Sequence, residues 1–210
     1  MRIRSSILAL SATMALLAGC GDDSSEPEED TEASACEYVD DGTQPSRPAE
    51  APDPDELVAE DEVTIATNRG DITLTLDPEN APCTVNSFVS LIQQDFYTDT
   101  VCHRVLGDAL LQCGDPTGTG TGGPGYGFAN ENATETNFTS GMLAMARTES
   151  PTGNGSQFFL VAKDIQLSGA YSVFGSIDQA GIDVLNEILA EGPGPDGVAP
   201  ANEVRIESIS

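Results

Sequence analysis

The stretch CHRVLGDALLQCGD, residues 102–115, decides how the fold and the chemistry of this chain are interpreted. It holds the only histidine of the 210 residues, two of the five cysteines and one of the eight basic residues. The short apolar segments VCHRV and ALLQC are typical of β-strands, and we expect them to form antiparallel neighbours. Successive side chains on a strand point to opposite faces. His103 is therefore expected to face one side of the sheet, and Arg104 the other side together with Cys102.

The remaining segments predict a mainly β fold with two well-separated helices. Two β-branched runs, VTIAT and DITLTL, flank the turn residues NRG and indicate a hairpin. Apolar residues at helical spacing predict helices over 81–95, with Pro82 near the first turn, and over 181–189. Further strand candidates are MLAMA, QFFLV, SVFGSI and EVRIESI. Many short strands with two helices are typical of a closed or nearly closed barrel.

Residues 1–20 have the features of an export signal. MRIR supplies two positive charges, and ILALSATMALLA is an apolar run that is too short to span a membrane. It ends in LAGC, residues 17–20, which resembles the lipobox of bacterial lipoproteins, where Cys20 would be lipidated and become the new N-terminus. We therefore expect an extracytoplasmic protein of a bacterium, anchored to the cell membrane by its acyl chains. The alternative is a plain signal peptide with a coincidental cysteine.

Acidic residues dominate the chain and are concentrated near its N-terminus. The formal net charge is −27, and residues 21–62 carry 17 acidic residues against one basic residue, Arg47. Segments that are rich in proline and acid and poor in apolar residues remain disordered. We therefore expect a disordered tether over 21–61, order from Glu62 onward and one folded domain over 62–210. The lack of a basic face argues against nucleic acid as a partner.

Four cysteines remain beyond Cys20, and four cysteines allow three pairings. Export implies an oxidising compartment, in which disulfides persist. We favour Cys102 with Cys113, on the two neighbouring strand candidates, and Cys36 with Cys83, which would tie the start of the ordered chain to a helix. Free buried thiols remain an alternative. A thiol oxidoreductase is disfavoured because the chain has no C-x-x-C pair.

The sequence argues against nucleophilic, metal and nucleotide chemistry. A nucleophilic mechanism needs a base, and the only imidazole, that of His103, is not expected to face its neighbour Cys102. A single histidine without a C-x-x-C pair argues against a zinc site, so we expect a hydrogen-bonded structural histidine. The segment GDPTGTGTGGPGYGF, residues 114–128, has seven glycines but lacks the lysine of a phosphate-binding loop. We therefore expect no metal and no cofactor.

Strand alternation predicts a different kind of site on the face of Arg104. Gln112 and Leu110 share one face of the next strand candidate, and Gln157 and Phe159 share one face of a third. Together these residues would form a shallow apolar pocket with one cation and two amides. Such a pocket can bind and polarise a peptide, but it has no nucleophile to cleave it. The alternative is an arginine that merely pairs with a surface carboxylate.

The motifs CHRV…LLQCGD, GTGTGGPGYGF, MLAMA, NGSQFFLVAKD and YSVFG resemble, in this order, those of the cyclophilin-type peptidyl-prolyl isomerases. The resemblance runs from about Val63 to Ser210. It implies an eight-stranded antiparallel closed β-barrel capped by two α-helices, and an enzyme that catalyses cis/trans rotation about X-Pro bonds. It also implies proline-containing polypeptides as clients, and we expect the protein to be a monomer.

Carried over residue by residue, the resemblance makes Arg104 the catalytic arginine and Gln112 the residue that helps to hold it and the substrate backbone. Ala109 stands where the family has a pocket Phe. Gln166 stands at a position linked to cyclosporin sensitivity, which argues against tight cyclosporin binding. The missing ring keeps a second hypothesis open, a non-enzymatic proline-peptide binder or chaperone on the same fold. The expected substrate-binding residues are Leu110, Ala146, Arg147, Gln157, Phe159, Leu167 and Tyr171.

Overall fold

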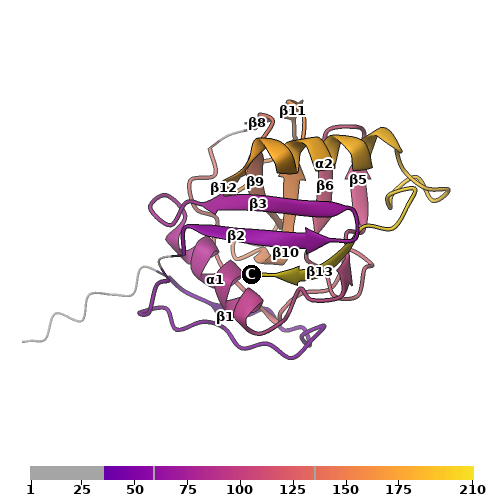
Figure 1. Cartoon of the computed structure of the whole chain (residues 1–210). Helices are drawn as coiled ribbons and strands as arrows, with labels where there is room; N and C mark the ends of the chain where they lie inside the picture. Colours follow the sequence, from indigo (N-terminus) through magenta and orange to yellow (C-terminus); the bar gives the residue numbers. More distant parts are fainter. Residues whose placement is uncertain (1–35, 59, 135) are drawn as a thin grey trace, which may run out of the picture. The chain divides into compact units, whose positions relative to one another are not determined.

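The computed structural model describes residues 36–58, 60–134 and 136–210. The expected signal peptide, the expected lipidation site Cys20 and the first part of the expected tether lie outside these residues. The described chain forms helices α1 (Pro82–Gln93) and α2 (Gln179–Ala190) together with thirteen strands (Figure 1). The strands are β1 (Val39–Asp40), β2 (Glu62–Thr67), β3 (Gly70–Leu76), β4 (Thr100–Val101), β5 (Arg104–Leu106), β6 (Leu110–Cys113), β7 (Tyr126–Gly127), β8 (Asn137–Phe138), β9 (Met142–Arg147), β10 (Asn154–Val161), β11 (Ile165–Gln166), β12 (Val173–Ile177) and β13 (Arg205–Ile209).

Nine strands form one antiparallel sheet, in the order β4-β13-β2-β3-β12-β9-β10-β6-β5. The edge strands β4 and β5 follow one another along the chain, separated only by Cys102 and His103. In this link the chain changes partner, since Cys102 N–H donates to Val204 O at 2.9 Å and His103 N–H donates to Gln112 O at 3.1 Å. The expected eight-stranded closed barrel is therefore wrong. The sheet curls as expected, but residues 100–106 contribute both of its edge strands, β4 and β5. The chain connects these two strands, and no ladder of hydrogen bonds between them closes the barrel.

β2 and β3 form the hairpin that the sequence predicts, in a register that pairs Val63 with Leu74. Both side chains are buried in the main apolar core, as the alternating pattern of the two strands requires. Gly70 follows the turn with φ of +130°, and a Cβ at this position would lie 3.0 Å from Cγ2 of Val184 in α2. Glycine at this turn therefore also permits the helix to pack closely on the hairpin.

Neighbouring residues of β6 and β10 enter two different apolar clusters. Leu111 and Phe158 belong to the main core, which also includes the buried faces of both helices. Leu110 and Phe159 belong to a smaller group on the opposite face of these strands, which we call the outer cluster: Leu110, Phe138, Ala144, Phe159 and Val161. Strand alternation thus places apolar side chains on the face of the sheet that also presents Arg104.

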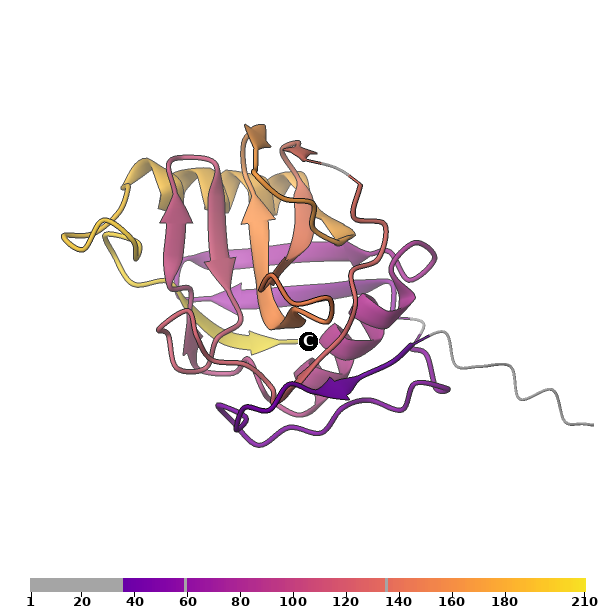
Figure 2. The same ribbon diagram turned by 180° about the vertical axis from the view of Figure 1, so that it is seen from behind.

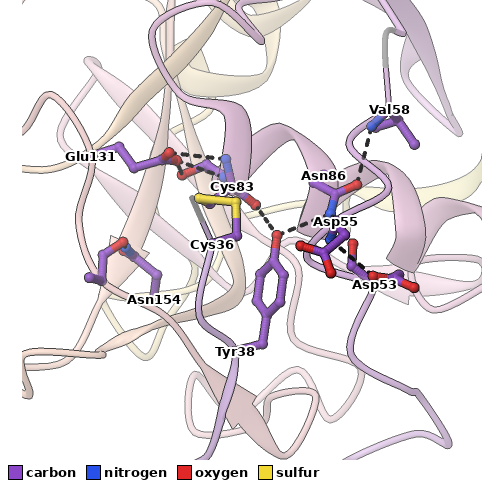
Figure 3. The surroundings of a disulfide bond; sticks show 11 residues. Cys36, Tyr38, Asp53, Asp55, Val58, Cys83, Asn86, Glu131 and Asn154 are labelled. Carbon is purple, nitrogen blue, oxygen red and sulfur yellow. Dashed lines mark hydrogen bonds between the residues drawn. A yellow bond between two sulfur atoms is a disulfide. The ribbon is translucent and has the colours of Figure 1, made fainter. Parts of the chain in front are cut away.

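Both helices form where apolar spacing predicts them, but their N-termini are capped differently. The Asp178 carboxylate accepts the N–H of Gly181 at 2.7 Å and caps α2 locally. No local side chain caps α1. Instead, the Glu131 carboxylate accepts the N–H groups of Cys83 and Thr84 at 3.0 and 2.7 Å. A residue distant in sequence therefore supplies the negative charge that a helix N-terminus favours (Figure 3).

Residues 36–58, which we call the arm, are ordered and pack against the domain beside α1 (Figure 1). β1 in the arm pairs with β7, and Ser46 exchanges two hydrogen bonds of 2.8 and 2.9 Å with Gly123. Arg47 Nη1 donates to the carbonyl oxygens of Asp95, Phe96 and Thr98 at 2.6–3.0 Å. The expectation of a disordered tether over 21–61 is therefore wrong for residues 36–58. Backbone pairing, the Arg47 side chain and a disulfide hold the arm in place.

Two disulfides form, and they are the pairs that the sequence favours. Cys36–Cys83 joins the arm to the first turn of α1, where the Tyr38 hydroxyl also donates to Cys83 O at 2.9 Å (Figure 3). Cys102–Cys113 joins the link between β4 and β5 to the end of β6. Within the described residues, no helix has both the length and the apolar character needed to cross a membrane.

Candidate active site

The hairpin of β5 and β6 brings Arg104 beside Gln112. The register pairs Arg104 with Gln112 and Leu106 with Leu110, so these four side chains lie on one face. Val105, between them in sequence, is buried in the main core. The Arg104 side chain is exposed. Figure 2 shows this hairpin from the side opposite to Figure 1, next to β9 and β10.

A chain of side-chain hydrogen bonds runs from Arg104 across three strands. Arg104 Nη1 donates to Gln112 Oε1 at 3.1 Å, and Gln112 Nε2 donates to Gln157 Oε1 at 2.9 Å. Gln157 Nε2 in turn donates to the Gly122 carbonyl oxygen at 2.9 Å. Among the described residues, no carboxylate lies within ion-pair distance of Arg104. The guanidinium is thus oriented by a neutral amide and is available to a ligand, which argues against the surface ion pair considered above.

A hollow of about 310 Å³ adjoins this guanidinium. Its apolar floor comes from the outer cluster, and Arg104 and Gln112 lie at its polar rim. This volume is at the lower end of the range of small-ligand sites, which begins at about 300 Å³. The residues that line it are Arg104, Leu106, Leu110, Gln112, Ala146, Arg147, Phe159, Gln166, Leu167, Ser168 and Tyr171.

Three aromatic rings form one wall of the hollow and the layer behind it. Phe159 and Tyr171 meet edge-to-face with centroids 5.3 Å apart, and Phe138 packs against both from behind. The Arg147 guanidinium lies over the Tyr171 ring, 5.6 Å from its centroid, and donates to Ala170 O and Thr148 O. Arg147 is therefore committed to contacts within the protein, whereas Arg104 is not.

A second hollow of about 650 Å³ adjoins the first, and no large apolar side chain lines it. It shares Gln112, Ala146 and Arg147 with the smaller hollow. It extends along residues 114–128, which we call the Gly-rich loop. Asp40, Asp41 and Thr43 of the arm line its far side. The chain upstream of residue 62 thus contributes to the surface next to the candidate site.

The Gly-rich loop is organised around the buried carboxylate of Asp115. This carboxylate accepts backbone N–H groups of Thr117, Thr119, Gly120 and Gly122 at 2.7–3.1 Å. Burial by itself would raise the pKa of Asp115, but the hydrogen bonds from Thr117 and from the loop amides outweigh it and hold the pKa below its usual range. The amides of this loop therefore bind a carboxylate of the chain itself.

His103 is buried and faces this loop. A Cβ at Gly120 would lie 3.4 Å from its Cδ2, so the loop backbone passes directly over the ring. Both ring nitrogens are buried, and neither makes a hydrogen bond of standard geometry to a described residue, although the Gln157 side chain interacts with the ring. Burial lowers the pKa of His103; the Asp115 charge opposes this, the Arg104 charge lowers the pKa further, and the hydrogen bond with Gln157 raises it. The neutral imidazole packs behind the site and does not reach the hollow.

Most of the residues that the sequence singled out meet at the smaller hollow. Both Arg104 and Gln112, and six of the seven expected substrate-binding residues, line it. Gln157 does not. It lies behind Gln112 and lines the larger hollow instead. The structure brings these residues together, while their roles remain predictions.

Leu106 and Ser168 line the hollow but were missed from the sequence, and Ala109 and Cys102 lie elsewhere than expected. Leu106 lines the hollow, and its position two residues after Arg104 on the same strand was a signal that could have identified it. Ala109 does not line the hollow, although it was expected at the pocket. Cys102 was expected on the face of Arg104 but is buried in the main core with Cys113. Strict alternation fails at Cys102 because the chain changes strand partner there.

The comparisons with known proteins agree with this geometry. Residues 62–210 match the family model described as "Cyclophilin type peptidyl-prolyl cis-trans isomerase/CLD". Among curated relatives, a probable peptidyl-prolyl cis-trans isomerase B of Mycobacterium tuberculosis is 42% identical over 165 residues, covering 70% of this chain and 53% of the relative. A peptidyl-prolyl cis-trans isomerase B of Streptomyces anulatus is 40% identical over 163 residues, covering 70% of this chain and 93% of the relative. The matched region thus spans about half of the mycobacterial relative and most of the Streptomyces one.

A solved structure shows the same fold. The cyclophilin-type isomerase of Cryptosporidium parvum, crystallised in the presence of the dipeptide Ala-Pro, superposes with a TM-score of 0.63 at 33% sequence identity. The match covers 70% of this chain and 96% of that one. The family model matches more than half of the chain, and the motifs around Arg104 lie within the matched region. This chain therefore belongs to the cyclophilin-type peptidyl-prolyl cis-trans isomerase family.

Proposed function

We propose that this chain is a peptidyl-prolyl cis-trans isomerase that accelerates rotation about X-Pro bonds. The observation that carries the proposal is an arginine without a carboxylate partner among the described residues, at a hollow of about 310 Å³ that has room for a proline ring beside Leu110 and Phe159. The family membership and the names of the relatives support the same activity. The proline ring enters the hollow against Leu110 and Phe159, and the peptide bond that precedes it lies near Arg104.

Such an enzyme must lower the barrier to rotation about a peptide bond, and it breaks no covalent bond in doing so. Resonance gives the peptide C–N bond partial double-bond character, so rotation costs about 18–20 kcal/mol. In the twisted state the resonance is lost, and the imide nitrogen gains a lone pair that can accept a hydrogen bond. The Arg104 guanidinium donates to this nitrogen, or to the neighbouring prolyl carbonyl, and so favours the twisted state over both planar states.

The energy required is within reach of these contacts. A thousandfold acceleration needs about 4 kcal/mol of preferential stabilisation of the twisted state. A charged donor beside an apolar surface forms stronger hydrogen bonds than it does in water. Gln112 holds the guanidinium in place, and Gln157 holds Gln112. Pre-orientation by these two amides reduces the entropy lost when the substrate binds.

We also propose where the enzyme acts. The N-terminal signal pattern ending at Cys20, together with two disulfides, supports a lipid-anchored, extracytoplasmic enzyme whose clients are exported proline-containing polypeptides. The test is expression of the full chain in a bacterial host. Mass spectrometry should detect acyl chains on Cys20 and a membrane-bound product, and Cys20→Ser should abolish both. A Cys20→Ser product with the same mass modification and the same membrane fraction would contradict the anchoring.

The isomerase proposal is tested with a proline-containing peptide whose cis-to-trans conversion is followed optically or by NMR exchange. Arg104→Ala should lower kcat/KM by about a hundredfold or more, because one directed donor to a charge-developing atom is worth this much. The matched control is Arg205→Ala, because Arg205 pairs with Glu203 far along the chain from the hollow-lining residues. Wild type that binds the peptide saturably without accelerating its isomerisation would favour the non-enzymatic binder instead.

A further inference from the structure

The disulfide Cys102–Cys113 lies at the point where the curled sheet changes from one set of partners to another. Up to Cys102 the segment bonds to the β13 side, and from His103 onward it bonds to β6. The disulfide crosses from this switch point to Cys113, with 4.0 Å between the two Cα atoms. Arg104 and Gln112 are a directly paired couple in the same hairpin. Cys102 therefore lies two residues from Arg104 along the chain, and Cys113 lies one residue from Gln112.

β5 has few other attachments. It consists of three residues, paired with β6 on one side. On its other side, Val105 N–H donates to the carbonyl oxygen of Val198, an exposed residue in the loop before β13. An edge strand with so few partners opens more easily than the strands inside a sheet. The chain itself connects one end of β5 to β6 through the turn at residues 107–109, and among the described residues the disulfide is the one covalent tie at the other end of this hairpin.

The position of the Arg104 guanidinium depends on the distance between these two strands. Among the described residues, its side chain makes one hydrogen bond, to Gln112 Oε1 across the hairpin at 3.1 Å. Gln112 is fixed from its far side by Gln157 on β10, whereas Arg104 has no comparable support. A shift of β5 away from β6 would therefore move the guanidinium, together with the lining residue Leu106, but leave Gln112, Leu110 and Phe159 on β6 and β10 in place.

We infer that the Cys102–Cys113 disulfide is a positioning element for Arg104, which holds β5 on β6 so that the guanidinium stays over the apolar hollow. This inference rests on the proposed isomerase function. The disulfide touches no substrate and acts through the arginine. The other disulfide, Cys36–Cys83, ties the arm to α1 and lies on neither strand of the β5–β6 hairpin. The two bonds therefore provide a matched pair for a test.

The test compares wild type with two variants. The site variant, Cys102→Ala/Cys113→Ala, lacks the site disulfide, and the arm variant, Cys36→Ala/Cys83→Ala, lacks the arm disulfide. For each protein, kcat and KM are measured separately with one Ala-Pro-containing peptide. Opening the site disulfide should lower kcat by about tenfold or more, since small misplacements of a positioned group cost this much. KM should change less than kcat, by about threefold at most, because Leu110 and Phe159 keep their places and only Leu106 moves with β5. Opening the arm disulfide should change kcat by less than about twofold. Equal kcat in wild type and the folded site variant would overturn the inference.

A second measurement separates positioning from general loosening. In an Arg104→Ala background, opening the site disulfide should cause no further loss of kcat, because the disulfide acts through the side chain that is already absent. Additive losses would mean that the bond supports the site in some other way and would overturn the inference. An inactive wild type would refute the proposed function itself, and so would be distinguishable from both results.

Folding of the site variant is monitored by near-UV circular dichroism. If the alanine pair does not fold, Cys102→Val/Cys113→Ala restores apolar volume at this buried site without the covalent link. A folded valine variant in which kcat falls by more than KM changes would support positioning. If neither variant folds while the arm variant does, the bond is needed for the fold instead of the placement of Arg104, and the inference is wrong.

Discussion

The two disulfides of this chain connect regions of opposite character. Cys36–Cys83 bridges 47 residues and fastens the arm to the first turn of a helix. Cys102–Cys113 bridges 11 residues and fastens two neighbouring strand segments that already share a hairpin. The first bond brings together parts of the chain that would otherwise be far apart. The second adds little to the topology but lies beside the paired residues Arg104 and Gln112.

The comparison teaches that stabilisation and positioning need not come from the same bond. In the chain-entropy model, a cross-link stabilises more when it closes a longer loop, because it removes more freedom from the unfolded chain. The arm disulfide should therefore contribute more to the free energy of unfolding. The site disulfide should contribute more to kcat, because it restrains the strand that presents Arg104. These two rankings run in opposite directions and can be measured on the same variants.

The largest expected effect is on stability. Removing Cys36–Cys83 should lower the free energy of unfolding by about 4 kcal/mol, and removing Cys102–Cys113 should lower it by about 3 kcal/mol, as the loop lengths imply. Urea unfolding of the two double-alanine variants at pH 7 measures both values. A site variant that loses clearly more stability than the arm variant would break the comparison. It would show that packing around Cys102 and Cys113, both at most 4% exposed, outweighs loop entropy.

A smaller effect tests whether the disulfide alone holds the arm. Arg47→Met removes three hydrogen bonds to the carbonyl oxygens of residues 95, 96 and 98, and should lower the free energy of unfolding by about 2 kcal/mol. The control is Arg69→Met, which removes a surface ion pair with Glu191 at 2.6 Å and should cost less than about 1 kcal/mol. If both variants lose the same free energy of unfolding, Arg47 does not anchor the arm. The arm is then held by the Cys36–Cys83 disulfide and by β1.

The arm also shows where sequence reasoning reached its limit. The hairpin β2–β3 and both helices follow from apolar spacing, because burial on one face repeats with the period of the element. The arm has no such period, and its composition alone indicates disorder. Its order comes from contacts with distant residues, namely Cys83, Gly123 and the loop after α1. Pairings of this kind leave no local pattern in the sequence.

The candidate site was predictable to the extent that it follows strand alternation. Arg104, Gln112, Leu110 and Phe159 share a face because consecutive strand residues alternate, and the structure brings them together. Alternation failed for Cys102, because the rule holds only while a strand keeps one partner, and the chain changes partner there. The bond that we infer to position Arg104 therefore lies at the one place in this hairpin where the sequence rule does not apply.

The smallest expected effect concerns pH and distinguishes the site region from the arm, which has no histidine. Burial holds the pKa of His103 below its ordinary value of 6.5 in the folded protein. Below pH 6.5 the unfolded chain binds a proton on His103 that the folded protein does not bind. The free energy of unfolding should therefore fall as the pH drops below 6.5, with a slope of at most about 1.4 kcal/mol per pH unit, and level off below the folded pKa.

Because His103 is the only histidine, urea unfolding between pH 7 and pH 5 measures this contribution in the window where an imidazole changes its charge. His103→Gln should remove the slope in this window, and the arm variant Cys36→Ala/Cys83→Ala should keep it. A slope that persists in His103→Gln would mean that another group titrates there. A slope that is absent in wild type would mean that the imidazole gains a partner or water on folding and is as easily protonated behind the site as in the unfolded chain.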